Sequence, residues 1–167
     1  MKPLYLSIKG LFSYRQEAEI DFTALTDAGL FGIFGPVGSG KSSVLDAMTL
    51  ALYGESDRLN SKERRNYNLM NLQSKELHIR FRFLQNGTEY LFTVEATRNS
   101  KNYDDVRTFK RRGYRIENGV PIALHDDNKS YSAQEVLGLS YDNFRRTIII
   151  PQGRFQEFLQ LRANDRR

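Results

Sequence analysis

The sequence has 167 residues and no cysteine, and its 40% hydrophobic and 27% charged residues are ordinary for a globular domain. The lack of cysteine excludes disulfides, cysteine metal sites and thiol catalysis within this stretch. No apolar run approaches the length of a membrane span, so we expect a cytoplasmic protein without membrane contact. The net charge of +5 permits contact with nucleic acid but does not establish it.

The first part of the chain predicts two short strands. Leu4, Leu6 and Ile8 alternate with polar residues, and a second alternation follows over residues 18–22. The apolar residues 30–34 then predict a short buried strand. A GTPase or kinase with a glycine-rich phosphate loop usually places that loop almost directly after its first strand. The two additional strands before the phosphate loop therefore favour a class of P-loop protein other than the GTPases and kinases.

Residues 35–42 fit the pattern Gly, any four residues, Gly-Lys-Ser. Glycine lets backbone N–H groups approach phosphates closely and tolerates left-handed φ values. The spacing predicts that the Lys41 ammonium group binds the β and γ phosphates and that the Ser42 hydroxyl binds Mg²⁺. The residues assigned to the nucleotide are Gly35, Pro36, Val37, Gly38, Ser39, Gly40, Lys41 and Ser42.

A helix is predicted directly after this loop, over residues 43–53, with Gly54 as its stop. Val44, Leu45, Met48 and Leu52 recur at helical spacing and predict its buried face. The positive end of such a helix points at a bound anion. A strand, a glycine-rich loop and a helix in this order are the context that the motif requires, so we interpret it as a nucleotide site.

The middle of the chain is β. Alternating apolar residues over 77–83 and 90–96 flank Asn86-Gly87 and predict a hairpin. A second β segment, over residues 106–116, turns at Asn118-Gly119 and returns over 120–124. It carries five basic residues, for which both a solvated strand face and a contact with the DNA backbone stay open. They are Arg107, Lys110, Arg111, Arg112 and Arg115.

The last third predicts a short helix over residues 132–137, a second one beginning near Asp142, and a strand over 147–150 that Pro151 ends. Gln152-Gly153 follows that strand. Nucleotide hydrolysis also needs an Asp after a run of four apolar residues, and no such run occurs. The sequence thus predicts half of an ATPase site.

Three features together resemble the N-terminal ATPase half of bacterial SbcC and its DNA-repair relatives in the ABC/SMC class. They are the two-strand preamble, the loop and helix of residues 35–54, and the Pro-Gln-Gly-x-Phe stretch at residues 151–155. The resemblance spans the whole chain. It implies an α/β P-loop NTPase fold, an ABC-ATPase-like N-terminal lobe with a mixed sheet and antiparallel β hairpins.

The resemblance also implies roles. Lys41 and Gln152 would be catalytic, Ser42 and Gln152 would hold Mg²⁺ beside ATP, and Ser43 would contact the α-phosphate. In this family a coiled coil and a C-terminal lobe with the acidic residue follow. We therefore expect residues 1–167 to be an N-terminal fragment that is inactive alone, with residues from 154 onward as the root of the coiled coil.

In the family, ATP clamps two copies together and controls DNA end processing in repair and recombination by a partner nuclease of the SbcD type. The implied partners are thus a C-terminal lobe, a second copy, that nuclease and DNA. Three alternatives stay open: a RecF- or SMC-like ATPase without a nuclease, a self-contained small P-loop phosphotransferase, and a non-catalytic nucleotide-binding module.

Overall fold

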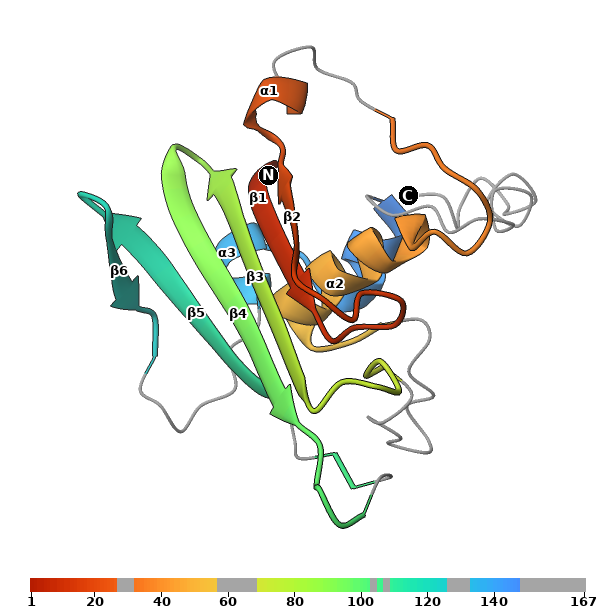
Figure 1. The fold of residues 1–167 in the computed structure, drawn as a ribbon. Coiled ribbons are helices and arrows are strands. Elements are labelled where there is room, and N and C mark those ends of the chain that lie inside the picture. The colour runs from red at the N-terminus through yellow and green to blue at the C-terminus, as the bar shows by residue number, and fades with distance from the viewer. Residues whose placement is uncertain (27–31, 57–68, 103–104, 107–108, 126–132, 148–167) are drawn as a thin grey trace.

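The computed structural model of the chain describes residues 1–26, 32–56, 69–102, 105–106, 109–125 and 133–147. These residues form a six-stranded sheet with helices packed on one of its faces (Figure 1). The strand order is β2-β1-β3-β4-β5-β6. The strands are β1 (Lys2–Lys9), β2 (Ala18–Asp21), β3 (Glu76–Gln85), β4 (Thr88–Thr97), β5 (Lys110–Glu117) and β6 (Val120–Ala123).

Every pair of neighbouring strands in the described residues is antiparallel, which confirms the predicted hairpins. The parallel pairs that a mixed sheet would add are not found within these ranges. Asn86 and Gly87 connect β3 to β4 with φ values of 50° and 78°. Asn118 and Gly119 repeat this conformation between β5 and β6, with 50° and 79°. Two central residues with positive φ make a type I′ turn, whose twist matches that of the strands.

Helix α2 (Lys41–Tyr53) packs against the inner face of the sheet and confirms the helix predicted after the phosphate loop (Figure 1). The sheet contributes alternating buried side chains, namely Leu6, Ile8, Leu77, Ile79, Phe81, Phe83, Phe92, Val94 and Ala96. Helix α2 contributes Val44, Ala47, Met48, Ala51 and Leu52. Leu45, predicted on the buried face, is instead 44% exposed. Gly54 ends the helix in the left-handed conformation, with φ of 73°.

Three short helices complete the described fold, α1 (Thr23–Thr26), α3 (Gln134–Leu137) and α4 (Tyr141–Thr147). Helix α4 packs on the C-terminal end of α2 through Tyr53, whose ring centroid lies 5.7 Å from that of Tyr141 and 5.2 Å from that of Phe144. The Tyr53 hydroxyl donates a hydrogen bond of 3.0 Å to the Leu139 carbonyl oxygen. These contacts fix α4 against the helix that begins at the phosphate loop.

Two predicted strands differ from the structure. Residues 32–34 are not in a strand, and Ile33 and Phe34 are 43% and 93% exposed. A strand needs hydrogen-bonding neighbours, and no described strand pairs with these residues. Thr147, predicted to begin a strand, is the last residue of α4, and its hydroxyl donates to the Asn143 carbonyl oxygen at 2.6 Å. Residues 30–31 and 148–150 of these two predictions lie outside the described ranges.

Candidate nucleotide-binding site

The phosphate loop turns sharply just before α2 begins. Gly38 and Gly40 have φ values of 86° and 90°, a conformation that residues with a side chain rarely adopt. The Ser39 N–H donates to the Pro36 carbonyl oxygen at 3.3 Å, and the Ser43 N–H donates to that of Gly40 at 3.0 Å. The loop is therefore folded as the glycine spacing predicts, with Gly40 as the N-cap of α2.

Lys41 lies across the mouth of this loop. Its ammonium group donates hydrogen bonds of 2.7 Å to the carbonyl oxygens of both Gly35 and Pro36. The charge is thus held where the loop curves back on itself, beside the N-terminal end of α2. A phosphate oxygen is a stronger partner for an ammonium group than a neutral carbonyl, so an incoming phosphate can compete for it.

Ser42 and Ser43 follow in the first turn of α2 and differ in exposure. The Ser42 side chain is exposed, so its hydroxyl is accessible to a hydrated cation. Ser43 is only 3% exposed. The first turn of α2 contains no acidic side chain, so the positive end of the helix dipole stays available to an anion. These features fit a nucleotide phosphate, and the accessible Ser42 hydroxyl is of the kind that would bind Mg²⁺.

The loop between β1 and β2 also contributes to the site, and no sequence motif revealed it. The Tyr14 hydroxyl donates a 3.3 Å hydrogen bond to the Gly40 carbonyl oxygen, 26 residues away. A Cβ atom on Gly40 would lie 2.8 Å from Ser13 Oγ and 2.9 Å from Tyr14 Cε2. Gly40 is therefore needed for close approach as well as for its φ.

The whole Mg²⁺ site stays a prediction, and its second expected ligand, Gln152, lies outside the described residues. Within the ranges that the structure describes, no group of three His, Asp or Glu side chains could hold a metal ion. Asp46, the acidic residue of α2, accepts a 3.0 Å hydrogen bond from the Ser56 hydroxyl. This bond ties the segment after α2 back to the helix.

The basic residues of β5 do not form one surface. The strand register places Arg111 opposite Val94, whose side chain is in the core, so Arg111 is on the inner face of the sheet. Lys110 and Arg112 are opposite Glu95 and Thr93 and are therefore on the outer face. Arg107 lies outside the described residues. The four basic residues that lie in β5 are thus divided between the two faces of the sheet by the alternation of the strand.

Arg111 reaches the C-terminal end of α2. A Cβ atom on Gly54 would lie 2.5 Å from both Cζ and Nε of Arg111. Burial lowers the pKa of the Arg111 guanidinium, and the nearby charge of Glu55 opposes this shift. A cation in this place interacts favourably with the negative end of the helix dipole. Arg111 therefore belongs to the packing of α2 on the sheet.

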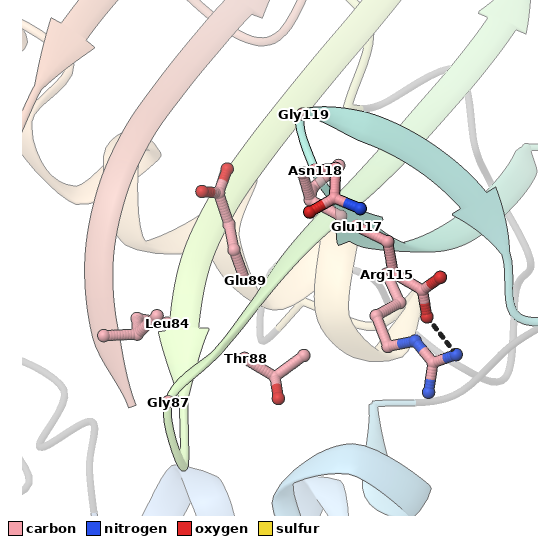
Figure 2. Close-up of a pocket in the computed structure, with 9 residues that line it drawn as sticks. Leu84, Gly87, Thr88, Glu89, Arg115, Glu117, Asn118 and Gly119 are labelled. Atoms are coloured by element: carbon pink, nitrogen blue, oxygen red, sulfur yellow. Dashed lines mark ion pairs between the residues drawn. The ribbon is translucent and has the colours of Figure 1, made fainter.

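Arg115 points toward a pocket between the tips of the two hairpins (Figure 2). Its guanidinium forms an ion pair with the Glu117 carboxylate, which the dashed line marks. The pocket has a volume of about 550 Å³ and an open, shallow form. The residues around it are Leu84, Gly87, Thr88, Glu89, Arg115, Ile116, Glu117, Asn118 and Gly119. None of them belongs to the phosphate loop, so this pocket is not the nucleotide site.

The comparisons with known proteins give the family of the chain. A protein-family model described as AAA domain matches residues 5–167. A Clostridium acetobutylicum protein, named as the SbcC component of the nuclease SbcCD, is 43% identical over 172 aligned residues, covering 100% of this chain and 14% of that protein. One of the same name from Bacillus subtilis is 41% identical over 169 residues, covering 100% and 15%. A solved SMC head domain from Thermotoga maritima aligns over 73% of this chain and 39% of its own, at 24% identity and a TM-score of 0.41.

The fold and the phosphate loop define a P-loop nucleotide-binding domain. The chain belongs to the AAA domain family, and over its whole length it is similar to SbcC proteins. This confirms the resemblance that the motifs indicated. The chain spans 14–15% of the length of the two curated relatives. Among the described helices none is long and apolar enough to cross a membrane.

Proposed function

We propose that this chain is the ATP-binding half of a DNA-repair ATPase of the SbcC type. The observation that carries the proposal is the position of Lys41 Nζ, held 2.7 Å from two carbonyl oxygens at the mouth of a loop that opens α2. A cation, a left-handed glycine loop and a helix N-terminus converge there. Together they provide the donors and the charge that a triphosphate needs.

The remaining parts of the catalytic site would come from elsewhere. In our proposal Lys41 binds the β and γ phosphates, Ser42 and Gln152 hold Mg²⁺, and Gln152 lies near the attacking water. A Gln carbonyl suits this task because it ligates a hard cation while its amide can orient water. A C-terminal lobe would bring the acidic residue, and ATP would join two copies into a homodimer. Hydrolysis would then release the two copies.

The nuclease partner is proposed from the relatives, which are named as components of the nuclease SbcCD. We propose a partner of the SbcD type whose access to DNA ends is controlled by the ATP cycle. A RecF- or SMC-like ATPase without a nuclease is the alternative. Co-purification of a metallophosphatase-type nuclease with the full-length protein would distinguish the two.

Contact with DNA is proposed for the outer face of β5. Lys110 and Arg112 point away from α2, and the Arg112 guanidinium lies 3.9 Å from the Glu95 carboxylate. Arg80 lies in the same cross-strand row as Arg112, two strands away, and is exposed. Cations spaced along an open sheet face suit the phosphate backbone of DNA. Arg111 and Arg115 are left out of this surface, because the register places them opposite Val94 and Tyr90, on the other face of the sheet.

The test is Mg²⁺-dependent binding and turnover of ATP by residues 1–167, with Lys41→Ala as the control. We expect wild-type binding that Lys41→Ala weakens, because Lys41 supplies the charge beside the phosphates. We expect turnover no higher than that of Lys41→Ala, because the catalytic acid is supplied by another lobe. Adding the C-terminal lobe should then produce turnover.

Two outcomes would contradict the proposal. Robust turnover by residues 1–167 that Lys41→Ala abolishes would mean that the site is complete, and would favour the self-contained phosphotransferase. Binding that is equal in the wild type and in Lys41→Ala would mean that the loop does not hold the phosphates.

A further inference from the structure

The loop between β1 and β2 is held in place from both sides. The Gly10 N–H donates to the Tyr14 carbonyl oxygen at 2.6 Å, and the Tyr14 N–H donates to that of Leu11 at 2.8 Å. From the other side, the Asn71 side-chain amide donates to the Phe12 carbonyl oxygen at 2.5 Å. Leu11 is fully buried. A loop with this many internal and external bonds presents its side chains in a fixed direction.

That direction is toward Gly40. The Gly40 carbonyl oxygen accepts two hydrogen bonds, one of 3.0 Å from the Ser43 N–H and one of 3.3 Å from the Tyr14 hydroxyl. The first belongs to the opening turn of α2. The second comes from a residue outside the phosphate loop and the helix. With two donors on one oxygen, the orientation of this carbonyl is set by both elements.

The orientation of the Gly40 carbonyl also determines the direction in which the Lys41 N–H group points. The Gly40 C=O and the Lys41 N–H belong to the same peptide plane, which is trans, so the two groups point in opposite directions. A glycine at φ of 90° has little steric resistance to rotation of the following peptide. Holding the carbonyl toward Tyr14 and Ser43 therefore holds the Lys41 N–H on the opposite side, where the loop opens.

We propose that Tyr14 is a positioning residue for the phosphate loop, whose hydroxyl holds the Gly40–Lys41 peptide so that the Lys41 N–H faces the nucleotide phosphates. The inference rests on the proposed nucleotide binding and adds a residue that the glycine-rich motif does not contain. The phenol is a donor only while it is protonated, and partial burial raises the pKa of Tyr14. The bond therefore persists at neutral pH.

The experiment compares Tyr14→Phe with Tyr53→Phe. The first change removes a hydroxyl bonded to the N-cap of α2, and the second removes the hydroxyl of the last residue of α2. Tyr53 donates to Leu139 at the opposite end of the helix and serves as the matched control. Each variant is titrated with Mg·ATP, and its midpoint of thermal unfolding is measured without nucleotide. The amide resonance of Lys41 is followed by ¹⁵N NMR in the nucleotide-free chain.

We expect Tyr14→Phe to weaken Mg·ATP binding about two- to fourfold, the lower end of the range for one hydrogen bond, because 3.3 Å is long for an O–H···O bond. It should shift the Lys41 amide resonance and lower the unfolding temperature less than Tyr53→Phe does, because its hydrogen bond is longer, 3.3 Å against 3.0 Å. Tyr53→Phe should lower the unfolding temperature and leave ATP affinity and the Lys41 resonance unchanged. A merely structural role for Tyr14 would lower the unfolding temperature without changing the ATP affinity or the Lys41 resonance.

Two results would overturn the inference. One is Tyr14→Phe binding Mg·ATP as tightly as the wild type while Lys41→Ala binds more weakly, which would leave the proposed nucleotide site intact. The other is a wild-type chain that binds no Mg·ATP, which would remove the proposed function and this inference with it.

Discussion

Gly54 lies at the contact between the end of α2 and strand β5, and Gly54→Ala tests that contact. The new methyl group would be placed 2.5 Å from Cζ and Nε of Arg111, so the guanidinium would have to move. Gly138 offers a matched control. It also ends a helix in the left-handed conformation, with φ of 69° against 73° for Gly54, but a Cβ atom there would meet nothing within 4 Å.

The magnitude follows from two contributions. A Cβ atom in the left-handed region costs about 1–2 kcal/mol, and the lower entropy of the unfolded alanine chain offsets about 0.4–1 kcal/mol of it. Gly138→Ala should therefore lower the free energy of unfolding by about 1 kcal/mol. Gly54→Ala also displaces Arg111 from the negative end of α2, which adds about 1–2 kcal/mol in a partly buried site. The expected total at Gly54 is about 2–3 kcal/mol.

The assay is thermal and urea unfolding of both variants, each also made in an Arg111→Ala background. One kcal/mol corresponds to about 2–4 °C for a chain of this size, so we expect decreases of about 4–12 °C for Gly54→Ala and about 2–4 °C for Gly138→Ala. In the Arg111→Ala background the cost of Gly54→Ala should fall to that of Gly138→Ala, because no guanidinium remains to be displaced. Equal costs for the two glycines in the wild-type background would refute the reasoning.

Two further predictions concern the outer face of β5 and the buried tyrosine of α2. The double variant Lys110→Gln/Arg112→Gln should lower the salt dependence of duplex DNA binding by about two in the slope of log K against log salt, whereas Arg115→Gln should not, because Arg115 is on the other face of the sheet. An unchanged slope in the double variant would remove the DNA surface. Burial raises the pKa of Tyr53 to about 12 from 10.0, so the contribution of its neutral form to stability is fully present below pH 10 and is lost as the pH rises to 12. Between pH 9 and 12 the unfolding temperature should therefore fall more steeply for the wild type than for Tyr53→Phe. Parallel plots of unfolding temperature against pH for the two proteins would contradict this.

Local patterns in the sequence were sufficient for much of the fold. The Asn-Gly pairs at residues 86–87 and 118–119 predicted both hairpin turns, because few residue pairs adopt two successive positive φ values without strain. The alternation over residues 77–83 predicted which face of β3 is buried. The glycines and Lys41 of the phosphate loop predicted the nucleotide site and the start of α2, since that geometry is encoded within a few neighbouring residues.

Arrangements that depend on distant residues were not predictable in this way. The expected strand over residues 30–34 is absent at positions 32–34, because a strand exists only when another strand supplies its hydrogen-bonding partners. The basic run of β5 looked like one surface in the sequence. The register with β4 decided that Arg111 packs under α2 while Lys110 and Arg112 face outward.

The proposal of a nucleotide site thus came from the sequence itself, through the glycines, Lys41 and Ser42 of one short loop. Only the tertiary structure brought Tyr14 onto the Gly40 carbonyl and Arg111 onto Gly54. The physical reason is that backbone conformation is set by neighbours along the chain, whereas such contacts depend on how the sheet, its connecting loops and α2 pack together.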